Sequence, residues 1–162
     1  TPLMVKDVSC GDLEPLWLMA QSVPSASLVP CVGFLPVGWS VAEVAVNNGR
    51  SLITLNHDRA GPAAMVVRLT PSCDLAGTTE VTSEQLGARR YVRVDDNRTG
   101  FSTTRSYVVP GGCITARFSA PAGQQHLAGE TSSMIGFTTR QQLAQALSDR
   151  SDGRLDLDPS AR

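Results

Sequence analysis

Lysine is nearly absent from this sequence, and charged residues of either sign are scarce. Every cationic side chain except Lys6 is an arginine, charged residues make up 18% of the chain, and the formal net charge is −1. Proteins that bind nucleic acids carry a basic surface excess, and electrostatic membrane contacts need a polybasic patch. The composition therefore argues against a nucleic-acid partner and against a membrane contact made by charge alone.

Long apolar runs are also missing. The longest apolar region extends from Leu28 to Val37, is interrupted by Pro30 and Pro36, and is shorter than the roughly 18 residues of a membrane span. Thr1 opens a mixed segment without the apolar region of a signal peptide. If the protein is exported, we expect its targeting or anchoring segment to precede Thr1.

Closely spaced metal ligands are the third absence, since the sequence has no C-x-x-C pair and only two histidines. Its four cysteines are widely spaced: Cys10, Cys31, Cys73 and Cys113. An even number of separated cysteines favours two disulfides and an oxidising compartment, whereas four buried free thiols in a cytosolic protein are the alternative. We expect no metal and no cofactor.

Four cysteines allow three pairings, and we predict Cys10 with Cys31 and Cys73 with Cys113. The first bond would join the start of a first helix to a second helix. The second bond would tie the end of a third strand to the start of a sixth strand.

The order of apolar patterns predicts an α+β domain: a mainly antiparallel sheet of about six strands, two N-terminal helices and one C-terminal helix packed on it, and two disulfides. Asp12 can cap a first helix that ends before Pro24, and Ser25 or Ser27 can cap a second helix through Leu35. Alternating apolar residues predict strands at Trp39–Val46, Arg50–His57, Met65–Leu69, Tyr91–Val94, Ser102–Val109 and Cys113–Phe118.

Local signals place turns, loops and boundaries. Asn47-Asn48-Gly49 predicts a tight hairpin, and a phase change predicts a bulge near Ala42 and Glu43. Thr139 and Gln142 form a capping box before the last helix. We predict loops at 74–88 and 120–129, a short strand at 134–137, a single domain over residues 1–147 and a polar, flexible tail over 148–162.

Val109-Pro110-Gly111-Gly112-Cys113-Ile114-Thr115 is the sharpest motif. It faintly resembles the nucleophile segment of the L,D-transpeptidases, which would imply a catalytic thiol at Cys113. That family has histidine and serine near the thiol where this chain has Gly112 and Gly111. A thiol nucleophile needs a base to form thiolate. We therefore favour a turn followed by a structural half-cystine.

Three polar clusters have a catalytic or metal-binding interpretation and a plainer one. His57-Asp58-Arg59 could be a fragment of a catalytic triad, but adjacent strand residues diverge, so a polar strand end is favoured. Asp95-Asp96-Asn97 could bind calcium, yet it lacks EF-hand spacing and a solvated turn is favoured. The same caution applies to the C-terminal acids Asp152, Asp156 and Asp158.

Arginines gather around two predicted neighbouring strands: Arg89, Arg90, Arg93, Arg98 and Arg105. On an exposed face they could contact an anionic partner, and Arg89, Arg93, Arg98 and Arg105 form our candidate partner surface. The alternative is ordinary solvated strand charge that discourages edge pairing.

Val23-Pro24-Ser25-Ala26, Pro30-Cys31, Leu35-Pro36-Val37-Gly38-Trp39 and Pro110-Gly111-Gly112-Cys113 together resemble segments of uncharacterised exported membrane proteins of high-GC Gram-positive bacteria. The resemblance covers residues 10–119. It implies an extracytoplasmic location, a single preceding membrane helix and disulfides, but no activity and no site residues.

The first functional hypothesis is a non-enzymatic extracytoplasmic interaction domain of a bacterial cell-envelope membrane protein. Its partner would be another envelope protein or envelope component. The alternatives are a thiol-dependent envelope enzyme that uses Cys113, and a lipid or small-ligand carrier whose apolar cavity is lined by Trp17, Phe34, Trp39 and Met65.

Overall fold

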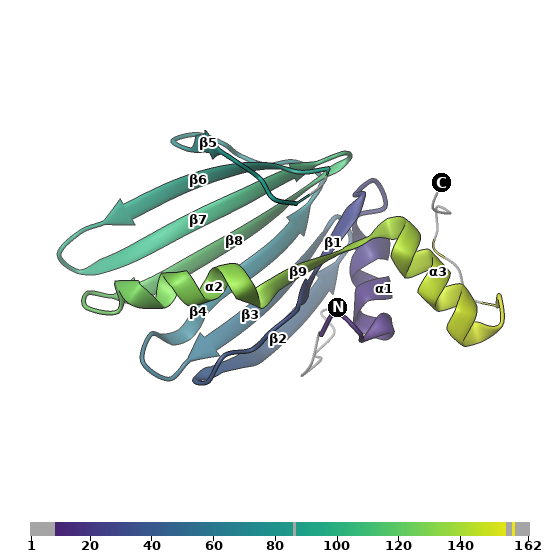
Figure 1. The fold of residues 1–162 in the computed structure, drawn as a ribbon, viewed down its shortest axis with the longest axis horizontal. Coiled ribbons are helices and arrows are strands. Elements are labelled where there is room, and N and C mark those ends of the chain that lie inside the picture. Colours follow the sequence, from purple (N-terminus) through teal and green to yellow (C-terminus); the bar gives the residue numbers. More distant parts are fainter. Residues whose placement is uncertain (1–8, 86, 155–156, 158–162) are drawn as a thin grey trace.

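The computed structural model describes residues 9–85, 87–154 and 157, and in these residues nine strands and three α-helices form an α+β fold (Figure 1). The strands are β1 (Leu28–Val32), β2 (Trp39–Asn47), β3 (Arg50–His57), β4 (Gly61–Thr70), β5 (Thr79–Val81), β6 (Arg89–Asp96), β7 (Gly100–Val109), β8 (Gly112–Pro121) and β9 (Ile135–Thr139). The helices are α1 (Leu13–Ser22), the short 3-10 helix η1 (Gln125–Leu127), α2 (Ala128–Met134) and α3 (Arg140–Ser151). The predicted class is confirmed, but the strand count and the placement of the helices differ.

Seven strands form one antiparallel sheet in the order β2-β3-β4-β8-β7-β6-β5, and β1 pairs with β9 in a separate two-stranded sheet. The six predicted strands all belong to the larger sheet. Its seventh strand, β5, lies in the region 74–88 that was predicted as a loop. All three β5 residues are exposed, so the sequence carries no buried alternation there.

The meander of β2, β3 and β4 follows the sequence pattern. Gly49 adopts a φ of 92° in the β2–β3 hairpin, a conformation that glycine reaches without steric cost. The register shifts between Val41 and Glu43, which confirms the predicted bulge. Buried and partly exposed residues alternate along β3, because one face of the sheet meets the core.

Residues 25–35 contain strand β1, so the prediction of a second helix there is wrong. Pro30 has no N–H for a helical hydrogen bond, and Val29 and Val32 are β-branched residues that fit a pleated strand. The partner strand comes from far along the chain, with Val32 opposite Ile135. All five β1 residues are buried.

Helix α1 ends two residues before Pro24, and a distant arginine replaces the donor that the proline lacks. The carbonyl of Ala20 would normally accept a hydrogen bond from residue 24, but Pro24 has no N–H. Instead, Nη1 of Arg140 donates to Ala20 O at 3.0 Å and makes longer contacts with Val23 O at 3.5 Å and Ala26 O at 3.4 Å. The first residue of α3 thus caps the end of α1.

Helix α3 begins with the predicted capping box, in which the Thr139 side chain and the Gln142 side chain each bond the other residue's backbone N–H. The predicted boundary between residues 147 and 148 falls inside this helix. Beyond it, Leu157 is 2% exposed and belongs to the core, while Leu155 lies outside the described residues. The region 120–129, predicted as a loop, holds η1 and the start of α2.

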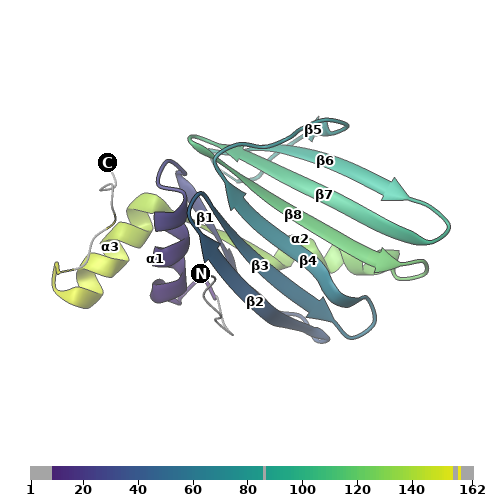
Figure 2. The ribbon, with the colours of Figure 1, turned by 180° about the vertical axis from the view of Figure 1, so that it is seen from behind.

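The larger sheet has two different faces. Helix α2 and the β1–β9 pair cross one face, which we call the inner face (Figure 1). The opposite, outer face has no helix over it among the described residues, as the reverse view shows (Figure 2). Within the part of the chain that the structure describes, no helix is long and apolar enough to span a membrane. The core lies on the inner face and includes Met65, Val67, Leu69, Ile114, Ala116 and Phe118.

Candidate functional site

Both predicted disulfides are present, Cys10–Cys31 and Cys73–Cys113, and they point to an oxidising environment. Cys31 lies on strand β1 rather than on a helix, so the first bond joins the segment before α1 to a strand. Cys113 has no thiol to ionise while it is bonded. The favoured interpretation of this residue as a half-cystine is confirmed.

The glycines before Cys113 serve a close approach of two chain segments. A Cβ on Gly111 would overlap the backbone carbonyl of Ser25, and one on Gly112 would lie 2.8 Å from the Ala26 Cβ. The Ser25 hydroxyl donates to Gly111 O at 2.6 Å. The Pro-Gly-Gly turn therefore packs against the α1–β1 connection.

His57 is a buried strand-end residue, 3% exposed. Its Nδ1 accepts hydrogen bonds from the backbone N–H of Arg59 at 3.0 Å and of Ala60 at 3.4 Å. Its Nε2 lies 2.8 Å from the point where a Cβ on Gly38 would stand. Asp58 is exposed while His57 is buried, and no hydrogen bond joins their side chains in the described residues, so they do not form a triad and the polar strand end is confirmed.

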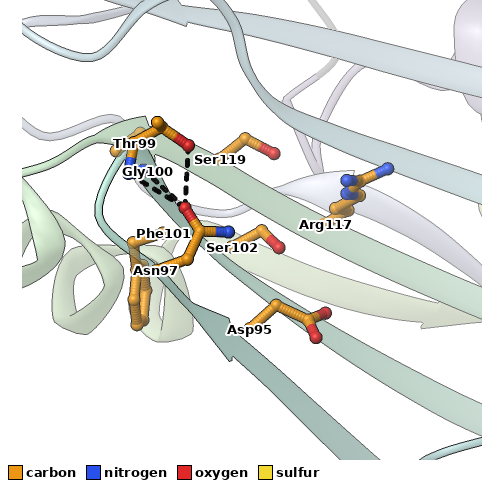
Figure 3. Close-up of a pocket in the computed structure, with 9 residues that line it drawn as sticks. Asp95, Asn97, Thr99, Gly100, Phe101, Ser102, Arg117 and Ser119 are labelled. Atoms are coloured by element: carbon orange, nitrogen blue, oxygen red, sulfur yellow. Dashed lines mark hydrogen bonds between the residues drawn. The ribbon is translucent and has the colours of Figure 1, made fainter.

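The Asp95–Asn97 segment is the end of β6 and its turn. Oδ1 of Asn97 accepts hydrogen bonds from Thr99 N, Thr99 Oγ1 and Gly100 N at 2.8–3.0 Å (Figure 3). In the described residues no three His, Cys, Asp or Glu side chains gather as metal ligands. Of the C-terminal acids, Asp156 and Asp158 lie outside the described residues.

The predicted arginine surface is divided between two faces of the sheet. Arg89 and Arg93 lie on the outer face, where Arg89 pairs with Glu80 at 2.8 Å, and Arg98 is exposed in the β6–β7 turn. Arg105 lies on the inner face and is only 7% exposed. The four residues therefore do not form one surface, because successive residues of a strand point to opposite faces.

Two arginines that the sequence pattern did not single out join Arg93 on the outer face. Arg93 of β6 is opposite Thr104 of β7, which is opposite Arg117 of β8. Arg68 of β4 is opposite Thr115 of β8, which is two residues before Arg117 and on the same face. Since neighbouring strands are about 4.8 Å apart, the backbones of Arg93 and Arg117 are about 10 Å apart across one intervening strand.

These three arginines line a groove of about 530 Å³, whose other lining residues are Asp74, Ala76, Thr78, Asp95, Thr104 and Thr115. One wall is the β4–β5 connection. The Cys73–Cys113 bond fixes the start of this wall to β8, and Asp74 Oδ1 accepts from Ala76 N at 3.0 Å within it. The wall is therefore held in place over the arginines.

The charges of the groove are only partly balanced. Nε of Arg93 lies 3.0 Å from Oδ2 of Asp95, so this pair is neutral. The side chains of Arg68 and Arg117 have no hydrogen bond or ion pair with any residue in the described ranges. Three cations and two carboxylates give the groove a net charge of 3 − 2 = +1.

A smaller hollow of about 230 Å³ continues the groove toward the β6–β7 turn and shares two of its lining residues, Asp95 and Arg117 (Figure 3). Ser102 of β7 is opposite both Asp95 of β6 and Ser119 of β8, and it lines the hollow together with Ser119 (Figure 3). The outer face thus offers guanidinium groups and hydroxyl groups in neighbouring rows, which suits an anionic ligand rich in oxygen.

No family model matches the sequence, and no curated protein sequence matches it either. Among solved structures, a crystal structure of a protein from Bacteroides thetaiotaomicron VPI-5482 is similar, at 12% sequence identity and a TM-score of 0.34. The similarity covers 70% of this chain and 46% of that protein. A likeness at this level carries no functional argument, so function is inferred from the residues of the groove.

Proposed function

We propose that this chain is a non-enzymatic, extracytoplasmic interaction domain of a bacterial cell-envelope protein, and that it binds an anionic envelope component through the outer groove. The observation that carries the proposal is the pair Arg68 and Arg117, two guanidinium groups without a carboxylate partner in the described residues. Arginine binds carboxylates and phosphates through paired, charge-assisted hydrogen bonds.

The arrangement of the groove supports binding without chemistry. Its polar groups stand on strands of one sheet and on a wall that is fixed by a disulfide, so they are organised before a ligand arrives. The two residues that a thiol mechanism would use are occupied, because Cys113 is bonded to Cys73 and Nδ1 of His57 accepts backbone hydrogen bonds.

Export is part of the proposal. Two disulfides in one domain are typical of proteins that fold in an oxidising compartment. The sequence resemblance to exported single-pass membrane proteins favours the outer side of the cell membrane, with the membrane anchor ahead of Thr1.

The carrier alternative has less support at the position proposed for it. Trp39 and Met65 are packed in the core, but Phe34 is 59% exposed, so the four predicted residues do not line one cavity together. No specific observation therefore favours a carrier with that cavity.

The test is a binding titration with two soluble anionic polymers, poly-L-glutamate for carboxylates and inorganic polyphosphate for phosphates, with neutral dextran as a blank. We expect R68Q/R117Q to weaken binding of the preferred polymer about tenfold, since each lost charged hydrogen bond is partly screened by solvent. Arg50 and Arg59 are exposed outside the groove, so R50Q/R59Q is the charge-matched control and should bind like the unmodified protein.

Comparison of the two polymers identifies the anionic group. Equal losses in R68Q/R117Q and R50Q/R59Q would show that only net charge matters and would remove the groove from the proposal. Absence of binding to both polymers would refute an anionic ligand altogether.

A further inference from the structure

Arg105 is a buried cation to which no carboxylate of the described residues is paired. Its side chain is 7% exposed on the inner face, and Nη2 donates to Oγ1 of Thr131 in α2 at 3.0 Å. That hydroxyl in turn donates to Ala128 O at 2.7 Å. Burial lowers the pKa of Arg105, Tyr107 acts in the opposite direction, and the nearby charge of Arg90 lowers it further. Buried charges in proteins are normally paired, so this arginine stands out.

Arg90 brings a second cation to the same place. It is on the inner face of β6 opposite Tyr107, while Arg105 is opposite Val92, so the two arginines are diagonal neighbours on adjacent strands. Nε of Arg90 is buried and has no hydrogen-bond partner in the structure. The two side chains therefore form a pair of unneutralised cations at the edge of the covered region.

No acidic side chain in the described residues pairs with either cation. Glu130 of α2 is on the same helix as Thr131, but its carboxylate accepts a hydrogen bond from Nε1 of Trp39 at 2.7 Å. Asp96 is on the same face of β6, four residues beyond Val92, which is about 13 Å along a strand. The guanidinium groups of Arg90 and Arg105 therefore have no counter-ion among the described residues, and an anionic ligand could supply one.

An apolar strip begins beside these cations and leads to the edge of the sheet. Val92 and Val94 of β6 and Val81 of β5 share the inner face with Arg90. Val94 is 58% exposed and Val81 is 38% exposed, and all three valines line an open hollow of about 640 Å³. Helix α2 crosses the middle of the sheet and does not extend over β5 (Figure 1).

We propose that this inner edge binds a single-chain fatty carboxylate. The carboxylate accepts hydrogen bonds from Arg90 and Arg105, and the acyl chain covers the exposed valines. A carboxylate fits better than a phosphate monoester, because it brings one delocalised negative charge to a position where Arg105 is almost fully desolvated. Burial of the valine strip under the acyl chain adds an apolar contribution to binding.

The two cations of this site, Arg90 and Arg105, lie on the opposite face from the outer groove, although Arg93 and Asp95 at the edge of the sheet line both hollows. Arg90 and Arg93 are three positions apart on β6 and point to opposite sides. Variants at each site therefore serve as controls for the other.

The test is calorimetric titration of the protein, with both disulfides intact, with sodium decanoate below its micelle concentration. Decanol removes the charge and acetate removes the chain. We expect decanoate to bind at least about tenfold more tightly than either compound. R90Q and V94S should each weaken decanoate binding, R90Q by about tenfold, whereas R117Q should leave it unchanged. Arg90 and Val94 are not fully buried, so these variants keep the core intact.

Each other outcome refutes the proposal. Equal binding of decanoate and decanol would mean that the arginines do not receive the head group. Unchanged affinity in R90Q would place the ligand elsewhere. Binding of poly-L-glutamate that is lost in R90Q but kept in R68Q/R117Q, with no decanoate binding, would show that the inner edge receives an acidic protein instead. T131V tests whether Thr131 holds Arg105 in place, and we expect it to weaken decanoate binding with little effect on decanol.

Discussion

Replacement of Arg140 by methionine should destabilise the whole fold, although the residue is far from both proposed sites. Arg140 is 8% exposed, and its Nη1 supplies the hydrogen bond that Pro24 cannot give to the carbonyl of Ala20. In R140M this buried carbonyl has no donor. The end of α1 also loses a positive charge that interacts favourably with the helix dipole.

The magnitude follows from these two losses. A hydrogen bond from a charged donor contributes about 1.5–3 kcal/mol, and the charge at a helix C-terminus about 0.3–1 kcal/mol. Nε and Nη2 of Arg140 are buried without partners, so their removal relieves part of the cost. We expect a net loss of about 2–3 kcal/mol, which lowers the melting temperature by about 5–10 °C for a chain of this size.

The assay is guanidinium chloride unfolding followed by circular dichroism, with thermal unfolding as a second measurement. R150M is the matched control, since Arg150 is exposed in the last turn of the same helix, and it should change stability by less than about 0.5 kcal/mol. R140K should fall between the two, because lysine keeps the charge but not the planar group. A stability of R140M within 0.5 kcal/mol of the parent, on that same scale, would refute the reasoning.

Two further stability changes follow from the fold. Replacing both Cys73 and Cys113 by serine should cost about 4 kcal/mol of stability in the loop-entropy model, and replacing both Cys10 and Cys31 about 3 kcal/mol, because the bonds span 40 and 21 residues. Denaturant midpoints of the two double variants measure the order of these losses, and the reversed order would contradict the model. Leu157→Ala should cost about 2–4 kcal/mol because the side chain is 2% exposed, and unchanged thermal unfolding would show instead that this side chain adds nothing to the core.

Local patterns predicted the part of the fold that is built from neighbours in sequence. Hairpins such as β2–β3 and the capping box of α3 depend on residues a few positions apart, so turn and cap residues reveal them. For strand β1 the local pattern gave the wrong prediction, a helix. Its serine caps and apolar spacing resemble a short helix, and the strand that pairs with it, β9, begins at Ile135.

The candidate site was harder to predict for a related reason. The sequence drew attention to arginines that are close along the chain, yet Arg105 and Arg93 point to opposite faces. Arg68 and Arg117 come from strands that meet Arg93 only through the order β4-β8-β7-β6, which no local signal specifies. Arg68 and Arg117 each interrupt an alternation of apolar residues, so the pattern indicates a solvent face for each. It does not show that the two arginines share one face.

The pairing of β1 with β9 also sets the order in which the chain can fold. During synthesis β1 emerges early, but its partner follows only after all seven strands of the larger sheet. Contacts of such long sequence separation form late and slow folding. Until then the five residues of β1, all buried in the finished fold, have no strand beside them. Shortening the chain before Ile135 would leave this apolar strand permanently without a partner and prone to intermolecular pairing.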